Sequence, residues 1–321
     1  MLRRWNRIVA VAGVVFAALT TVFGQGGEDS GMLAALKAKL EASEFEFSRA
    51  ESDVPFLPLA GITVAAYGKT EFMPAGGEGG TVDYRSSYVG AYSTVPLYIG
   101  RSGFGVAVPY VSHTRFDSLS DGHEDQEVDS FYLPLAAIWQ VESGNQWGGF
   151  IMPSVNSPIS GEGEWAEDFM GGALGRHFSG DKAMWYYGLV YDYSFGANYM
   201  YPYLGYTYQP ERQWVISLVM PWPAVSYAPS DQFVVTAGVM PSGANWAMHP
   251  EGESSQVTGS FGGWDLGARC GWRLTNVLWF SAGAGFSGLR SLQVEENGEL
   301  VFEQNLSREP FVSLTLSIRP N

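Results

Sequence analysis

The stretch FVSLTLSIR at residues 311–319 decides the fold. Val312, Leu314, Leu316 and Ile318 stand at its even positions, and serine or threonine fills most positions between them. A period of two residues is that of a β-strand, whose side chains point alternately to opposite faces. One face of this strand therefore suits an apolar environment, and the other suits water.

The same alternation recurs through most of the chain after residue 60. The apolar side chains occupy the odd positions in 182–195 and the even positions in 261–274 and 276–290. Noisier alternation marks six other stretches, at 62–72, 88–99, 102–116, 129–141, 199–208 and 231–241. Because lipid-facing and lumen-facing residues cancel, such strands give a mean hydropathy near zero, here −0.03. The pattern predicts an all-β, antiparallel, up-and-down transmembrane barrel.

Connections of two lengths separate these strands. Short breaks fall at 100–102, 143–145, 179–181, 209–212, 229–231 and 275. Longer and mostly acidic connections fall at 74–80, 118–128, 157–166 and 244–257, and Asn297-Gly298 predicts a tight hairpin. Short turns on one side and long loops on the other are typical of a barrel in the outer membrane of a Gram-negative bacterium.

Counting from Gly61 in the periplasm gives 14 strands and returns the C-terminus to the periplasm. The count depends on residues 212–228, where Pro221 and Pro223 either form a tight loop or kink a single strand. If they kink one strand, the barrel has 12 strands.

The N-terminal 60 residues differ from the rest. Arg3, Arg4 and Arg7 precede an apolar run at 8–23, which predicts a signal peptide over 1–24. Residues 25–60 are expected to form a periplasmic linker or a plug-like segment, with a short helix at 32–41; a helix that binds a partner is the alternative. Residues 61–321 would then form the barrel.

Charge and composition exclude several classes of protein. The formal charge is −15, and loss of the three signal arginines would leave −18, so a nucleic-acid partner is not expected. Cys270 is the only cysteine, which excludes an intrachain disulfide. After Arg49 only Lys69 and Lys182 remain among the lysines, too few for the polar face of a water-soluble sandwich. Seven tryptophans fall near predicted strand ends, where headgroups suit them: Trp139, Trp147, Trp185, Trp214, Trp222, Trp272 and Trp279.

One segment resembles a known family. In 214–246, MPWPAVSY at 220–227 precedes a Pro-Ser-Asp turn and then GVMP at 238–241. This resembles a family of uncharacterised bacterial outer-membrane β-barrel proteins, in which a Pro-x-Pro-x-x-x-Tyr strand leads into a Gly-x-x-Pro strand. The resemblance implies a fold and a location over about residues 60–321, and no catalytic residue. The chain departs from many outer-membrane barrels by ending in Ile318-Arg319-Pro320-Asn321 instead of an aromatic residue.

The sequence offers little chemistry. The stretch VSHTR at 111–115 lacks the His-x-Ser spacing of lipid-modifying barrel enzymes, so we expect His113 to be a lumen or interface residue and the protein not to be an enzyme. Residues 117–129 hold six carboxylates whose order does not match a calcium-binding loop. A solvated acidic external loop is expected there, with weak binding of divalent cations as the alternative. No cofactor is predicted.

The polar faces of the strands remain as candidate sites. Five charged residues are predicted to face the lumen: Lys182, Asp192, Asp265, Arg269 and Arg273. We therefore expect a non-enzymatic, porin-like barrel, embedded in outer-membrane lipid, that passes or binds small solutes. Two alternatives stay open: a structural or surface-interaction barrel closed by its own side chains or by residues 25–60, and a lipid-modifying enzyme with His113 at the outer rim near a serine.

Overall fold

The structure is a computed structural model, and it describes residues 43–55, 58–72, 82–119, 125–142, 144–159, 165–194, 197–248, 257–296 and 299–319. The predicted signal peptide, the predicted helix at 32–41 and the Asn297-Gly298 turn lie outside these residues. None of the described residues forms a helix long and apolar enough to cross a membrane.

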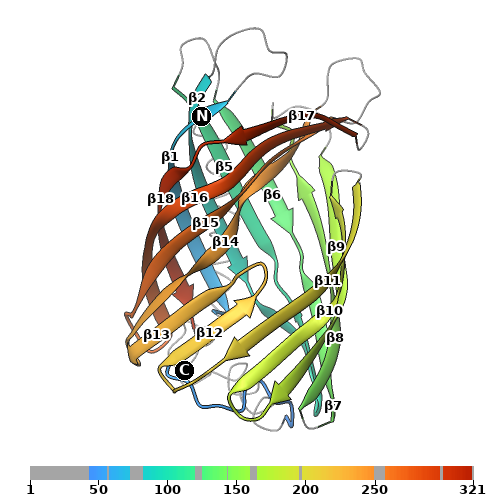
Figure 1. Cartoon of the computed structure of the whole chain (residues 1–321), viewed down its shortest axis with the longest axis vertical. Helices are drawn as coiled ribbons and strands as arrows, with labels where there is room; N and C mark the ends of the chain where they lie inside the picture. The colour runs from blue at the N-terminus through green and yellow to red at the C-terminus, as the bar shows by residue number, and fades with distance from the viewer. Residues whose placement is uncertain are drawn as a thin grey trace, which may run out of the picture.

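Eighteen antiparallel strand segments form one sheet that closes on itself (Figure 1). In chain order they are β1 (Ala60–Phe72), β2 (Val82–Ser93), β3 (Val95–Ile99), β4 (Gly103–Ala107), β5 (Tyr110–Ser118), β6 (Gln126–Tyr132), β7 (Leu135–Glu142), β8 (Asn145–Asn156), β9 (Ala166–Ser179), β10 (Ala183–Ser194), β11 (Ala197–Tyr208), β12 (Trp214–Val219), β13 (Ala224–Ser230), β14 (Phe233–Met248), β15 (Val257–Arg273), β16 (Leu278–Glu296), β17 (Glu299–Leu306) and β18 (Glu309–Ile318).

These segments make a ring of 14 strands, because four strands of the ring are each built from two consecutive segments. The pairs that continue one another are β2 with β3, β4 with β5, β6 with β7, and β17 with β18. The ring closes where β1 pairs with β18, from Ala60 opposite Ile318 to Tyr67 opposite Phe311. The predicted barrel and its preferred strand count are confirmed.

The segment that left the count open contains two strands. β12 and β13 pair from Trp214 opposite Tyr227 to Ser217 opposite Ala224, and Pro221 and Pro223 lie in the turn between them. The 12-strand alternative is therefore wrong. The Pro-x-Pro pair of the family-like motif belongs to this turn and not to a strand, since a proline cannot donate a ladder hydrogen bond.

The described wall follows the predicted alternation. On β18, Val312 and Leu314 are 59% and 49% exposed on the outside, whereas Ser313, Thr315 and Ser317 are buried on the inside. The inner face is held by side-chain hydrogen bonds such as that between the Thr63 and Thr315 hydroxyls, 2.9 Å apart. An apolar outer face and internally paired strands suit a lipid bilayer. With its unequal connections, the protein is an outer-membrane β-barrel.

Two sequence-based boundaries need correction. Residues 244–248 belong to β14 and not to the long loop predicted at 244–257, because they pair with 257–261 of β15. Trp279 was predicted to lie in the headgroup layer, but it is 3% exposed and packs inside the barrel against Ala228, Val234 and Val54. Trp279 holds an odd position on a strand whose even positions face lipid. The other tryptophans of that prediction, such as Trp139 and Trp222, are exposed.

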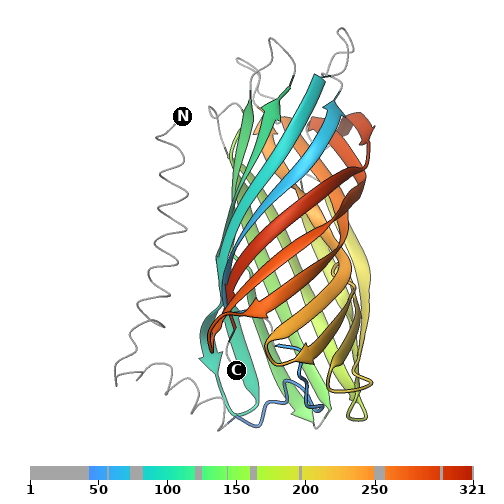
Figure 2. The ribbon, with the colours of Figure 1, turned by 90° about the vertical axis from the view of Figure 1, so that its left-hand side faces the viewer.

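Residues 43–55, here called the strap, run across the end of the barrel where the short turns lie (Figure 2). The strap begins beside the β3–β4 turn, where the Glu44 amide donates to the Arg101 carbonyl, 2.7 Å away. It ends beside the β11–β12 turn, where the Asp53 amide donates to the Arg212 carbonyl, also at 2.7 Å. We call this end of the barrel the short-turn end and the opposite one the long-loop end.

Candidate functional site: the lumen and its two closures

A cavity of about 700 Å³ occupies the lumen of the barrel. Tyrosines cover one wall: Tyr88 and Tyr92 from β2, Tyr110 from β5 and Tyr132 from β6. The rings of Tyr110 and Tyr132 are 5.5 Å apart between centroids. Methionine, phenylalanine and tryptophan side chains line other parts, among them Met152, Phe311 and Trp222. Such surfaces combine apolar area with hydroxyl groups that can hydrogen-bond a ligand.

Asp265 carries the most distinctive polar group of this cavity. The alternation of β15 places its side chain inside the barrel, where Asp265 is only 6% exposed. The Tyr67 hydroxyl of β1 donates to Asp265 Oδ2 over 2.9 Å. Among the described residues, the buried Asp265 Oδ1 has no hydrogen-bond partner. A buried acceptor without a partner is costly, so a ligand that donates a hydrogen bond here would be stabilised.

Three of the five residues predicted to face the lumen line this cavity. Asp265 and Arg269 stand four residues apart on the same face of β15, and Asp192 reaches the cavity from β10. Arg319, which follows β18, adds a second guanidinium that the sequence reasoning did not single out.

The other two predicted residues lie at the short-turn end. Lys182 precedes β10 and donates from Nζ to the carbonyl of Pro210 in the neighbouring turn, 2.6 Å away. Arg273 ends β15, and its Nη2 lies 2.8 Å from Asp231 Oδ2. Neither lines the cavity, because both stand where the alternation of their strands ends. Both lie at the rim of the barrel, so a role for them in the lumen stays a prediction.

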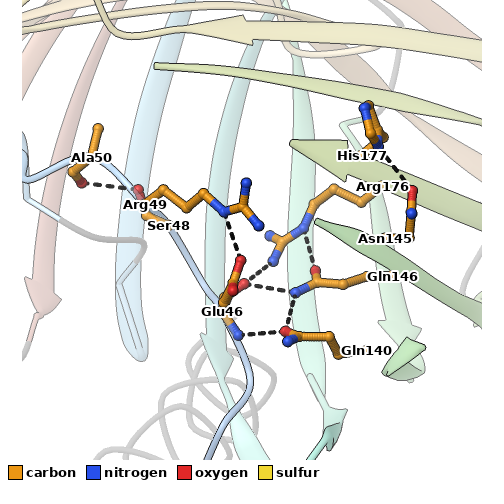
Figure 3. Close-up of polar contacts among 9 residues, drawn as sticks. All are labelled: Glu46, Ser48, Arg49, Ala50, Gln140, Asn145, Gln146, Arg176 and His177. Carbon is orange, nitrogen blue, oxygen red and sulfur yellow. Dashed lines mark hydrogen bonds and ion pairs between the residues drawn. The ribbon is translucent and has the colours of Figure 1, made fainter. Parts of the chain in front are cut away.

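The strap closes the short-turn end through a polar network (Figure 3). Arg176 Nη2 donates to the backbone carbonyl of Glu46 over 2.5 Å, and Arg176 Nε donates to Gln146 Oε1 over 2.5 Å. Gln146, which is fully buried, donates from Nε2 to the same Glu46 carbonyl at 2.8 Å. The Glu46 amide in turn donates to Gln140 Oε1 at 2.8 Å. Three barrel strands thus hold one residue of the strap.

Aromatic rings pack around this network. The Arg176 guanidinium lies over the rings of Phe45 and Phe178, with 5.7 Å and 5.1 Å to their centroids. The Arg49 guanidinium also lies over the Phe178 ring, 4.8 Å from its centroid, and Arg49 Nε contacts Glu46 Oε2 at 2.7 Å. Phe45 is 7% exposed. Burial of the strap therefore combines apolar area with charge-assisted hydrogen bonds.

Exposed ion pairs hold both ends of the strap. Glu44 contacts Arg101 at 2.6 Å, and the hydrogen bond from this guanidinium holds the pKa of Glu44 below its usual value. Arg212 Nη1 lies 2.6 Å from Glu51 Oε2, and its Nη2 lies 3.2 Å from Asp53 Oδ1. Because these pairs are exposed, they contribute less than the buried network at Glu46.

An apolar cluster closes the lumen toward the long-loop end. Its buried members come from opposite sides of the ring: Phe116 of β5, Val128 of β6, Ala244 and Trp246 of β14, and Phe261 of β15. The backbone of Gly243 has φ +144°, a conformation suited to glycine, just before β14 enters this cluster. Residues on both walls therefore meet across the barrel axis.

A buried ion pair supports this cluster. Arg290 Nη1 and Glu309 Oε1 are 2.5 Å apart, with side-chain exposures of 1% and 0%. Thr70 donates to Glu309 Oε2 over 2.6 Å, and the Arg290 guanidinium lies 4.4 Å from the Phe261 ring centroid. The pair therefore joins β16, β18 and β1 to the apolar cluster.

The sequence reasoning missed the strap contacts and the Arg290–Glu309 pair. A signal for Arg176 was present, since it is a charged residue on a strand rich in glycine and apolar residues. Its partner could not be inferred, because Glu46 lies 130 residues away and outside the alternating pattern.

His113 lies on β5, and the described part of the acidic stretch 117–129 lies where β5 ends and β6 begins. His113 Nδ1 lies 2.8 Å from Asp129 Oδ1, and the histidine is buried. Arg115 contacts Asp117, Asp125 at 2.7 Å and Glu127 at 3.5 Å. A guanidinium therefore neutralises part of the acidic run. No group of three or more potential metal ligands occurs among the residues that the structure describes.

Comparisons with known proteins find similar barrels only among solved structures. No protein-family model matches the chain, and no curated protein matches it. A Pseudomonas aeruginosa FadL homologue matches 81% of this chain and 89% of its own, with 11% identity and a TM-score of 0.42. An outer-membrane channel from Pseudomonas putida F1 matches 84% and 99%, with 11% identity and a TM-score of 0.40. The translocator domain of the autotransporter NalP from Neisseria meningitidis matches 95% and 99%, with 13% identity and a TM-score of 0.32.

Proposed function

We propose that this outer-membrane barrel binds small amphipathic solutes in its lumen and passes them across the membrane. The observation that carries the proposal is the cavity of about 700 Å³, which combines tyrosine and phenylalanine walls with Asp265 Oδ1, a buried acceptor that has no partner among the described residues. A cavity of this size holds a molecule of one or two rings. The apolar walls would take the body of the solute, and Asp265 would accept a hydrogen bond from its hydroxyl or amino group.

The charges of the cavity favour solutes with a donor or a positive group at Asp265. Arg269 and Arg319 also line the cavity, so a second polar group of opposite character could be bound on the same solute. The proposal concerns a class of solute and not a single compound.

Calorimetric titration with two matched probes tests the proposal. Phenethylamine and toluene share an aromatic ring, but only phenethylamine carries a donor. Asp265→Asn should weaken phenethylamine binding about tenfold or more, since a hydrogen bond to a charged group contributes about 1.5–3 kcal/mol. The same substitution should leave toluene binding within about twofold. The matched control is Asp231→Asn at the short-turn rim, where the carboxylate is 71% exposed. Saturable binding of neither probe would overturn the proposal.

A closed structural barrel is the second candidate, and the two closures of the lumen favour it. Planar-bilayer recording separates the two functions. Stepwise conductance that phenethylamine reduces supports the solute channel. A folded, heat-modifiable barrel that neither conducts nor binds the probes supports the structural barrel.

A further inference from the structure

Among the residues that the structure describes, the wall of the barrel is incomplete between β11 and β14. The hairpin β12–β13 is shorter than its neighbours, as Figure 1 shows. β12 pairs only with Gly205–Tyr208 of β11, and β13 pairs with residues 233–238 of β14. The last backbone bond to the hairpin is donated by the Val239 amide to the Pro223 carbonyl, at 2.9 Å. Beyond it, the described parts of β11 (197–204) and β14 (240–248) each pair with a strand on one side only.

Two prolines mark these free edges. Pro202 stands opposite Leu189 of β10, and Pro241 stands opposite Trp264 of β15, both within unshifted registers. A proline has no N–H to donate, so each must occupy a position whose backbone nitrogen points away from its paired strand. That direction is toward the gap on both strands. The hydrogen bonds of β14 agree with this direction. Val239, two residues before Pro241, donates its amide hydrogen bond to the same side, toward the hairpin.

The cavity reaches one of these edges. Met240 and Pro241 are neighbours in one strand, so their side chains leave opposite faces, yet both line the cavity. Trp222, at the tip of the short hairpin, also lines it. Met240 stands opposite Asp265 and faces the lumen, whereas Pro241 stands opposite Trp264, on the side of lipid-facing Leu266, and is exposed. The cavity thus meets the outer surface around the free edge of β14.

We propose that the gap between β11 and β14 is a lateral opening through which small amphipathic solutes move between the lumen and the lipid bilayer. This inference rests on the proposed function and gives it a route. The strap and the apolar cluster close the two axial ends, whereas the gap is bordered by exposed apolar side chains such as Met200 and Leu204, which are 66% and 65% exposed. None of the described residues at the two edges, 197–204 of β11 and 240–248 of β14, is charged, so these edges suit a solute with an apolar body.

A free strand edge can also pair with an added β-strand from a partner protein, but the two prolines argue against such pairing here. Pro202 and Pro241 each remove a donor from the edge that such a strand would need, as prolines do on edge strands that avoid pairing. The remaining backbone groups need water or a solute as partners, since unpaired groups in hydrocarbon are costly. The gap lies in the half of the barrel toward the long loops, where headgroup water is near.

Amide hydrogen exchange measured by NMR tests the geometry of the opening. In β11, Met200 and Leu204 share the parity of Pro202, so their amides point into the gap and should exchange at least 100-fold faster than those of Tyr201 and Tyr203, which point toward β10. Equal protection of both sets would overturn the opening.

Blocking the gap tests its use. In a Cys270→Ser background, Met240→Cys is modified with a bulky maleimide, and Leu266→Cys serves as the matched control because Leu266 is 62% exposed on the lipid face of β15. The exchange of 4-fluorophenethylamine between protein and lipid nanodisc is followed by fluorine NMR. We expect the Met240 adduct to slow exchange at least tenfold and the control adduct to change it less than twofold.

The outcomes separate the route from the function. A bound fluorine signal with equal exchange in both adducts would overturn the lateral route and leave the solute-binding function standing. No bound signal in the unmodified protein would overturn both. If the Met240 adduct loses its heat-modifiable mobility, Leu204→Cys on the opposite edge takes its place under the same expectations.

Discussion

Replacing Arg176 by methionine should release the strap from the short-turn end. Arg176 donates two hydrogen bonds, to the Glu46 carbonyl and to Gln146 Oε1, both at 2.5 Å. Hydrogen bonds from a charged group contribute about 1.5–3 kcal/mol each. The contacts with Phe45 and Phe178 add about 0.5–1 kcal/mol each. Methionine keeps some of the packing and Gln146 keeps its own bond to Glu46, so we expect a net local loss of about 3–4 kcal/mol, below the sum of those contributions.

That loss should raise the released population of the strap about 100- to 1,000-fold, at about 1.4 kcal/mol per tenfold change. The barrel itself should keep its heat-modifiable mobility, because its strands pair without the strap. Trypsin offers a local assay, since Arg49 lies within the strap and contacts Glu46 and the Phe178 ring. When opening is fast relative to cleavage, the rate of cutting follows the open population. Mass spectrometry can follow cleavage between Arg49 and Ala50 alone.

The matched control is Arg212→Met, which removes another arginine that holds the strap. Arg212 is 63% exposed and its partner Glu51 is 79% exposed, so the pair contributes about 0–1 kcal/mol. Cleavage should then rise at most about fivefold. Parental cleavage rates in the Arg176 variant, or equal rates in both variants, would refute the argument that the buried network holds the strap.

Two further predictions concern the long-loop end. Trp246→Ala should open the apolar cluster and raise the single-channel conductance in planar bilayers. It should also lower the free energy of unfolding by about 3–5 kcal/mol, as large-to-small core substitutions do. Unchanged conductance would show that the cluster is not a barrier. Glu309→Gln should lower the free energy of unfolding by about 3–5 kcal/mol, because it leaves Arg290 buried beside a neutral group. Denaturant titration of the protein in detergent micelles measures this loss. A loss below about 1 kcal/mol would contradict that account, and Glu303→Gln on exposed β17 is its control.

The barrel could be predicted because its wall is specified locally. Each strand carries its own two-residue period, and turn residues mark where it reverses, so the fold follows without knowledge of distant partners. The closures could not be predicted in this way. Glu46 meets Gln146 across 100 residues, and Trp246 meets Phe116 across the lumen. Neither contact leaves a periodic trace in the sequence.

For the same reason, only part of the candidate site could be predicted from the sequence. Alternation places Asp265 and Arg269 on the inner face of β15, and both line the cavity. It cannot tell how far along the barrel axis a residue lies, which is why Lys182 and Arg273 were expected in the lumen although they stand at the rim. Position along the axis depends on strand tilt and on where each strand ends.

The two closures are built from different forces, and this difference determines how each would open. The strap is held by arginines and backbone carbonyls, with exposed ion pairs at its ends. Salt screens those exposed pairs, so raised ionic strength should loosen the ends of the strap while the buried network at Glu46 keeps its centre. The cluster around Trp246 and Phe261 is apolar, and salt screening does not weaken apolar packing. A solute that enters from the side, between β11 and β14, would meet neither closure.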